Sequence, residues 1–279
     1  PPDDADAGVA QLREKIPALL AKARLAHGPV SVEATPRRLV VTVADLAPSA
    51  SDAAERVRGP PAKAAYGPDG APTKALLGFC AKNGLDPATG VSLEADAKGV
   101  EYVWGVATSV GAPAADALEE ALPALLASLA FGRTMRWAAG GPAFSRPVRW
   151  LVALHGGRAL GLSGLGIPAA GSTTKGLRSG PDAPLLPVPD AASYAGVLRD
   201  AGITLSAAER EAAIAAGAAS AAAAVGGSVP AGPMTASLLA ETARLTEAPL
   251  PLLGSFDPAF LALPRDVLVM VMKKPQRYF

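Results

Sequence analysis

The order of apolar patterns along the chain constrains the fold most. Three runs rich in β-branched or aromatic residues, at residues 38–46, 100–110 and 147–155, predict strands, and all lie in the first 165 residues. After residue 190 the apolar spacing is helical and capping signals recur. Because strands and helices are not in regular alternation, we expect an α+β fold, mixed in the first two-thirds and mainly helical in the last third.

The predicted elements suggest two units, residues 1–112 and 113–279, the second ending in helices. Pro17 is expected to kink or break the first helix. The Gly156-Gly157 pair predicts a hairpin, and residues 181–189, with four prolines, predict a linker or an extended edge. Turns are expected at residues 60–61 and 67–70. The predicted helices are residues 5–26, 73–83, 114–131, 190–201, 206–225, 234–246 and 264–274.

Composition excludes several classes of protein. The 279 residues are 50% hydrophobic, which is enough for one large domain or two modest ones. The single cysteine, Cys80, excludes an internal disulfide framework, and His27 and His155 are too far apart in sequence to suggest a metal centre. No apolar run is long enough for a membrane span, and no secretory leader is visible. The abrupt first and last residues suggest a piece of a longer chain.

Charge is distributed unevenly. The formal net charge is +1, yet residues 121–181 contain no acidic residue and carry a formal charge of +7. A second basic group, Lys273, Lys274 and Arg277, follows the last acidic residue, Asp266. Clustered Lys and Arg attract polyanions such as nucleic acids. The alternative is that these arginines pair with acids from elsewhere in the fold.

Catalytic motifs are missing from the sequence. Neither the G-x-G-x-x-G loop nor the G-x-x-x-x-G-K-[ST] loop occurs, and the G-L-S-G at residues 161–164 fails the nucleophile-elbow pattern. Cys80, His155 and Ser163 show no spacing typical of a nucleophile and its base. We therefore predict no catalytic residue and no metal ligand in this chain.

Four pairs of short motifs, in order along the chain, carry the most specific signal. They are A-H-G with A-T-P-R-R-L (26–28, 34–39), R-V-R-G-P with G-A-P-T-K-A (56–60, 70–75), M-R-W with F-S-R-P-V-R-W (135–137, 144–150), and L-T-E-A-P with M-K-K-P-Q-R-Y-F (245–249, 272–279). Together they resemble the beta subunit of bacterial-type glycyl-tRNA synthetase, most of all its plant and algal organellar form. One departure is Gly176-Leu177-Arg178, where many bacterial members have G-H-R, so no role of that histidine transfers.

The resemblance implies a part of a glycine–tRNA ligase. The intact enzyme would use ATP with Mg²⁺ to activate glycine, then transfer it to the terminal adenosine of tRNA(Gly). The ATP and glycine pockets would belong to an alpha part, separate or fused upstream, so this chain would hold no cofactor. It would be the leading portion of beta, in a dimeric assembly away from membranes. The compartment would be the chloroplast or mitochondrion in a plant or alga, and the cytoplasm in a bacterium.

The first hypothesis for this portion is that it binds and positions tRNA. Trp137 and Trp150, each beside an arginine, would stack on unpaired bases, or alternatively lie in the core. The Arg37-Arg38 pair could equally anchor a turn through carboxylates. The candidate tRNA-binding residues are Arg37, Arg38, Arg133, Arg136, Arg146, Arg149, Lys175, Arg178, Lys273, Lys274 and Arg277.

Two other hypotheses remain open at this point. In one, the chain is a docking scaffold for the alpha part with little tRNA contact, and the apolar helix face of Leu118, Leu122, Leu125 and Leu129 is an interface. In the other, the chain is an independent hydrolase or deacylase acting on charged tRNA, supported only by Cys80, His155 and Ser163.

Overall fold

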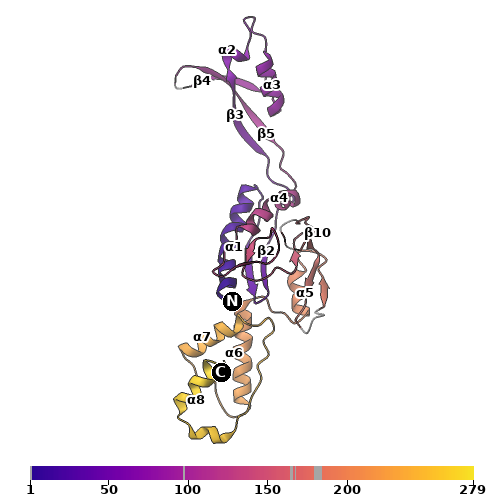
Figure 1. The fold of residues 1–279 in the computed structure, drawn as a ribbon. Helices are drawn as coiled ribbons and strands as arrows, with labels where there is room; N and C mark the ends of the chain where they lie inside the picture. Colours follow the sequence, from indigo (N-terminus) through magenta and orange to yellow (C-terminus); the bar gives the residue numbers. More distant parts are fainter. Residues whose placement is uncertain (1, 97, 164–165, 167, 179–183) are drawn as a thin grey trace. The chain divides into compact units, whose positions relative to one another are not determined.

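The computed structural model describes residues 2–96, 98–163, 166, 168–178 and 184–279 (Figure 1). The chain forms two compact units. The larger unit comprises Pro1–Leu20, His27–Asp45 and Leu118–Phe279, and the smaller unit comprises Ala21–Ala26 and Leu46–Ala117. Across the described ranges, no helix has the length and apolar character needed to cross a membrane. The mixture of helices and several small sheets confirms the predicted α+β class.

The larger unit begins with a helix packed on a hairpin. Helix α1 (Pro2–Lys22) buries Leu12, Ile16 and Leu20. Strands β1 (Val30–Thr35) and β2 (Arg38–Val43) pair antiparallel, with Thr35 opposite Arg38 across a two-residue turn. A Cβ on Gly8 would lie 2.9 Å from Leu39 Cδ1, so the glycine permits the close approach of α1 to β2.

The end of helix α4 (Ala114–Ala127) is joined to α1 by polar contacts. The Gln11 side-chain amide donates to Ala130 O at 2.6 Å and accepts from Ala130 N at 2.9 Å. Lys15 Nζ donates to Ser128 O and Ser128 Oγ, each at 2.8 Å. These bonds satisfy backbone groups that the end of a helix leaves without an intrahelical partner.

The apolar face of α4 belongs to the core of this structure. Leu118, Leu125 and Leu129 are buried, and Leu122 is half-buried. The hypothesis that this face is an interface to another subunit is therefore wrong for Leu118, Leu125 and Leu129, because side chains of the same chain already cover them.

Short strands follow α4 in the larger unit. Antiparallel pairs are β6–β7, β9–β10 and β12–β13, while β8 and β11 pair parallel. The β9–β10 pair, with His155 opposite Arg158, confirms the predicted hairpin at Gly156-Gly157. The bounds are β6 (Met135–Arg136), β7 (Ala143–Phe144), β8 (Leu151–Val152), β9 (Leu154–His155), β10 (Arg158–Ala159), β11 (Ala170–Gly171), β12 (Thr173–Lys175) and β13 (Leu185–Pro187).

Helices complete the larger unit. The Ser206 side chain accepts from Glu209 N at the start of α6, as the capping-box match predicts. Helices α6 and α7 pack together, with Ile214 and Leu238 buried. The bounds are α5 (Tyr194–Asp200), α6 (Ala207–Ala223), α7 (Pro233–Ala243), η1 (Pro258–Ala262) and α8 (Arg265–Lys273).

The smaller unit is a three-stranded antiparallel sheet covered by two helices. The strand order is β3–β5–β4, with β5 in the centre. Ala65, Leu76, Cys80 and Val103 form its core. Gly84 ends α3 with a left-handed φ of 65°, as predicted. The bounds are β3 (Ala53–Pro61), α2 (Ala62–Ala65), α3 (Lys74–Asn83), β4 (Val91–Ala95) and β5 (Glu101–Ser109).

Several local predictions were wrong. Strands β1, β3 and β4 were not predicted, and Pro60-Pro61 ends β3 where a turn was expected. Of the kink or break expected at Pro17, the break does not occur, because helix α1 runs through this residue. The strand expected at residues 147–155 is two short strands, β8 and β9. The proline-rich residues 181–189 are an exception, because residues 185–187 form strand β13, in agreement with the extended edge that was one of the two alternatives. Residues 181–183 lie outside the described part.

The structure also divides the chain differently from the predicted units 1–112 and 113–279. Helix α1 and the β1–β2 hairpin pack with the residues that follow Leu118, so the larger unit is discontinuous in sequence. The smaller unit lies within the sequence of the larger one. Composition and periodicity report local structure, whereas this division depends on long-range contacts.

Candidate functional site

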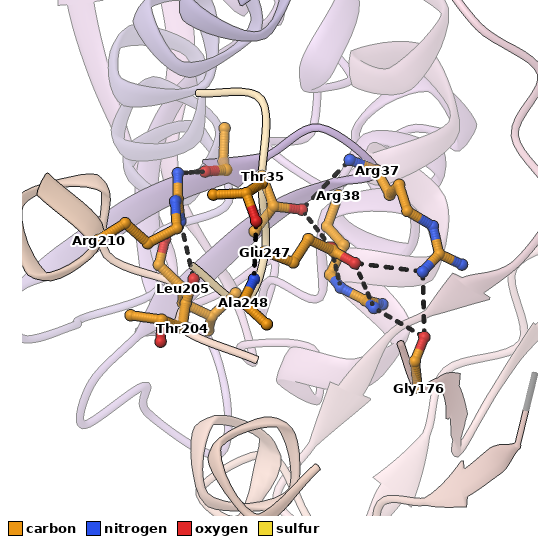
Figure 2. Close-up of polar contacts among 11 residues, drawn as sticks. Thr35, Arg37, Arg38, Gly176, Thr204, Leu205, Arg210, Glu247 and Ala248 are labelled. Atoms are coloured by element: carbon orange, nitrogen blue, oxygen red, sulfur yellow. Dashed lines mark hydrogen bonds and ion pairs between the residues drawn. The ribbon is translucent and has the colours of Figure 1, made fainter. Parts of the chain in front are cut away.

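The conspicuous polar cluster of the larger unit is built around a buried carboxylate, Glu247 (Figure 2). Its Oε1 accepts a hydrogen bond from Thr35 Oγ1 at 2.6 Å. Its Oε2 accepts from Arg37 Nη1 at 3.2 Å and from Arg38 Nη2 at 3.4 Å. The tight β1–β2 turn makes this possible, because it presents three polar side chains from four successive residues, Thr35 to Arg38, to the segment that follows α7.

Arg38 is the buried member of this cluster, with a side chain only 2% exposed. Its Nε lies 2.8 Å from Glu247 Oε1, close enough for an ion pair although the N–H does not point at the oxygen. Its Nη2 and Arg37 Nη1 also donate to Gly176 O, at 3.4 and 3.1 Å. A buried charge of this kind is stable only when paired, so Arg38 and Glu247 depend on each other.

Three cations surround one half-buried ring, that of Trp150. The Arg37 and Arg38 guanidinium carbons lie 5.6 and 5.3 Å from the ring centroid, and Lys175 Nζ lies 5.9 Å from it. These distances are within the range of cation–π attraction. Glu247 is the carboxylate of this group, so the group contains three positive charges and one negative charge. In addition, Arg38 Nη1 is buried and has no protein hydrogen-bond partner among the described residues.

A second buried arginine, Arg210, joins three segments of the larger unit (Figure 2). Its side chain donates to four backbone carbonyls: Ala243 O at 2.7 Å, Thr204 O at 2.8 Å, Leu205 O at 2.6 Å and Ala34 O at 3.0 Å. Burial lowers the pKa of Arg210, while nearby carboxylates, Glu33 first among them, act in the opposite direction. Its role is structural, because all four bonds go to backbone carbonyls of the same unit: Ala34 in β1, Ala243 at the end of α7, and Thr204 and Leu205 in the connection before α6.

The structure brings only some of the candidate residues together. Arg37, Arg38 and Lys175 meet around Trp150, whereas Arg136 donates to Gly141 O in its own hairpin. At the other end of the unit, Lys273 donates to Thr235 Oγ1 and Arg277 pairs with Glu241. The exposed candidates are Arg133, Arg136, Arg146, Arg149, Arg178, Lys274 and Arg277.

Three of the exposed arginines have open surroundings. In the part of the chain that the structure describes, no carboxylate pairs with Arg133, Arg146 or Arg149. The nearby Trp137 is 43% exposed, and its Nε1 donates to Phe144 O at 2.9 Å. This stretch therefore presents guanidinium groups and an aromatic ring to solvent.

The sequence analysis missed Glu247, Arg210 and the central position of Trp150. Glu247 lies in the L-T-E-A-P motif, which contributes to the family resemblance, but no role was predicted for this residue. No local signal identifies Arg210, whose carbonyl partners lie up to 176 residues away in sequence. The expectation that Arg37-Arg38 anchors a turn through a carboxylate is confirmed.

The residues considered for catalysis do not form a site. Cys80 is buried in the core of the smaller unit, and burial raises the pKa of its thiol, so it is not an activated nucleophile. His155 is half-buried in β9, and Ser163 is exposed next to residues outside the described part. Within the described ranges, no group of three or more His, Cys, Asp and Glu side chains is placed to hold a metal ion.

The family follows from comparison with known proteins. Residues 1–279 match the model of the family described as glycyl-tRNA synthetase beta subunit. The chain belongs to this family. The resemblance carried by the A-T-P-R-R-L and L-T-E-A-P motifs is thereby confirmed, and these two motifs supply Thr35, Arg37, Arg38 and Glu247 of the buried cluster.

Relatives include plant and bacterial proteins. The chain is 39% identical over 279 residues to the chloroplastic/mitochondrial glycine–tRNA ligase 2 of Arabidopsis thaliana, covering 100% of this chain and 25% of that protein. It is 38% identical to the glycine–tRNA ligase beta subunit of Desulforudis audaxviator over 279 residues, covering 97% of this chain and 38% of the relative. The beta subunit of Nitratidesulfovibrio vulgaris (strain Miyazaki F) is 38% identical over 270 residues, with 96% and 38% coverage. The chain thus spans well under half the length of these relatives.

Proposed function

We propose that this chain is the leading portion of the beta part of a glycine–tRNA ligase and that it helps bind and position tRNA(Gly). The observation that carries the proposal is a set of exposed arginines, Arg133, Arg146 and Arg149, that have no carboxylate partner among the described residues, in a whole-chain match to the beta subunit family. Spaced guanidinium groups on a surface bind phosphates without reading sequence, which suits a positioning role.

Catalysis would take place elsewhere. ATP with Mg²⁺ and glycine would bind to an alpha part, either a separate subunit or fused upstream, in an assembly we propose to be dimeric. This division is supported by the buried state of Cys80 and by the structural use of Glu247 and Arg210. The compartment would be the chloroplast or mitochondrion in a plant or alga, as for the Arabidopsis relative, and the cytoplasm in a bacterium.

Neutralising the exposed arginines tests the proposal. We expect a variant with Arg133, Arg146 and Arg149 all changed to Gln to bind tRNA(Gly) more weakly. The plot of log affinity against log salt should become shallower by about 0.7–0.9 per lost phosphate contact. A matched control changes three exposed arginines outside the acid-free window: Arg199, Arg244 and Arg265. Unchanged tRNA affinity and salt slope in the first variant would refute the proposed contact.

A docking role is the second candidate, and a different observation favours it. Residues 250–263 expose several large apolar side chains, among them Leu250, Leu252 and Leu261 at 78%, 81% and 65% exposure. Exposed apolar patches of this kind mark protein interfaces. If this role dominates, the chain will capture an isolated alpha part without tRNA, and Leu250→Ser with Leu252→Ser will abolish the capture.

A further inference from the structure

The smaller unit has an open sheet face that the proposed function does not use. Helices α2 and α3 pack on the face that carries Val103, where a Cβ on Gly59 would lie 2.9 Å from Phe79. Because side chains alternate along a strand, Tyr102, Trp104 and Val106 of β5 lie on the opposite face. Figure 1 shows these two helices and the β3–β5–β4 sheet together.

Two arginines of β3 cover the aromatic rings of this face. The Arg56 guanidinium carbon lies 4.5 Å from the Trp104 ring centroid, and that of Arg58 lies 4.6 Å from the Tyr102 centroid. The strand register explains the pairing: Arg58 is opposite Trp104 and Arg56 is opposite Val106, so each arginine reaches diagonally to the next ring. The result is two guanidinium–ring contacts, about 7 Å apart along the strand.

The face is open to solvent and hollowed at one end. Arg56, Arg58 and Val106 are exposed. A hollow of about 350 Å³ beside the start of β4 is lined by Arg56, Trp104 and Val106 of this face, and also by Leu85, Val91 and Gly105 of the helix-covered side. Arg56 forms an ion pair with Glu94 of β4, which lies on the far side of the central strand β5. In the described part of the chain, no carboxylate pairs with Arg58.

We propose that this face, comprising Arg56, Arg58, Tyr102 and Trp104, binds unpaired nucleotides of an RNA. Single-stranded bases are recognised by stacking on aromatic rings and on guanidinium planes, and sheet surfaces with exposed aromatics are a recurring platform for it. Each contact here presents a flat guanidinium on which one base can lie, and Arg58 has donors left for a phosphate. The identification of this RNA as tRNA(Gly) rests on the proposed function.

Charge and composition favour RNA over a protein partner as the occupant. A protein interface core is depleted in charged residues, whereas this face carries two arginines over two rings, with Glu94 paired to Arg56. The smaller unit contains eight basic and eight acidic residues and has no net charge, so long-range attraction contributes little here. Binding should depend on stacking and show a shallow salt dependence, unlike binding by the exposed arginines of the larger unit.

The test compares single-stranded and duplex RNA on the full chain. The probes are a fluorescent 12-nucleotide oligouridylate, a 12-base-pair duplex RNA and a tRNA(Gly) transcript. We expect Trp104→Leu to weaken oligouridylate binding by about 5- to 150-fold, Tyr102→Leu to weaken it similarly, and neither to change duplex binding. Phe260→Leu, which removes an exposed aromatic of the larger unit, is the matched control.

The outcomes separate this inference from the proposed function. Oligouridylate affinity that is the same in wild type, Trp104→Leu and Tyr102→Leu overturns the inference, even if tRNA(Gly) binding still depends on the larger unit's arginines. Loss of oligouridylate binding in both variants supports it, even if neutralising those arginines has no effect. The protein could instead self-associate in a way that Trp104→Leu abolishes, while oligouridylate binding is kept. That result would mean that the face binds a second copy of this chain, and it would also overturn the inference.

Discussion

Two arginine pairs close in sequence have different surroundings in the two units. Arg37 and Arg38 share one carboxylate, Glu247, which is buried with Arg38. Arg56 and Arg58 lie over the rings of Trp104 and Tyr102 on an exposed face. The difference arises from position in the strand: neighbours at a tight turn can reach the same partner, whereas residues two apart lie on one face and meet a row of side chains on the next strand. Positive charge alone therefore does not identify a nucleic-acid contact.

The largest expected effect is the loss of stability when the buried ion pair between Arg38 and Glu247 is broken. Glu247→Gln leaves the Arg38 guanidinium buried without a counter-charge, so we expect the free energy of unfolding of the larger unit to fall by about 3–5 kcal/mol. Denaturant unfolding followed by circular dichroism measures this change. Glu241→Gln is the control, because its pair with Arg277 is about half exposed and should contribute at most about 1 kcal/mol. Equal losses in the two variants would erase the distinction between buried and exposed arginines.

A substitution of Arg210 tests independently whether a buried arginine stabilises the fold of the larger unit. Arg210→Met keeps much of the side-chain volume but leaves four carbonyl oxygens without their donor. We expect a loss of about 3 kcal/mol, since buried groups left without hydrogen bonds cost about 1–3 kcal/mol each and some of these will find water. Arg199→Met, at an exposed position of α5, should change stability by less than about 0.5 kcal/mol. A stable Arg210→Met variant would contradict the structural role.

Smaller effects are expected when one arginine of each pair, Arg58 or Arg37, is replaced and stability is compared with RNA binding. Arg58→Gln should change stability by less than about 0.5 kcal/mol and weaken oligouridylate binding, because its side chain is exposed and has no buried partner. Arg37→Gln should show the opposite pattern, with lower stability and unchanged oligouridylate binding, because its guanidinium binds Glu247 and Gly176 O. Parallel unfolding and fluorescence-anisotropy titrations measure both quantities. The comparison fails if the two variants behave alike.

The fold class and most helices could be predicted because their signals are local. The capping Ser206, the terminating Gly84 and the apolar spacing of α1 act within a few residues. Strands β1, β3 and β4 were missed because their stability comes from pairing with other strands, and β3 and β4 expose many of their side chains. The discontinuous larger unit depends on contacts such as that between Arg210 and Ala34, which no window of sequence contains.

The candidate site was predictable only in part, for the same reason. The basic character of residues 121–181 is a property of composition, and the exposure of Arg133, Arg146 and Arg149 agrees with it. The burial of Arg38 depends on Glu247, 209 residues later in the chain. A signal for the sheet face was present, since Tyr102 and Trp104 alternate against Val103 and Gly105, but its meaning required the register that brings Arg56 and Arg58 onto the rings.

The smallest expected effect concerns Cys80, which lies beneath the sheet that carries Arg56 and Arg58. Burial raises the pKa of the Cys80 thiol, so the native protein should react slowly with a thiol reagent at pH 8, and denaturant should make the reaction fast. The thiol of the unfolded chain ionises near pH 8.5, below the raised native pKa. The contribution of this group to stability is therefore complete below about pH 8.5 and is lost as pH rises toward the native pKa.

This reaction also decides how the binding variants are interpreted. If Trp104→Leu and Tyr102→Leu lose oligouridylate binding while Cys80 stays as slow to react as in wild type, the smaller unit is still folded and the lost affinity belongs to the removed rings. If Cys80 instead reacts quickly in these variants, the rings stabilise the sheet. Arg56 and Arg58 would then be structural like Arg37 and Arg38, and the contrast between the two pairs would no longer hold.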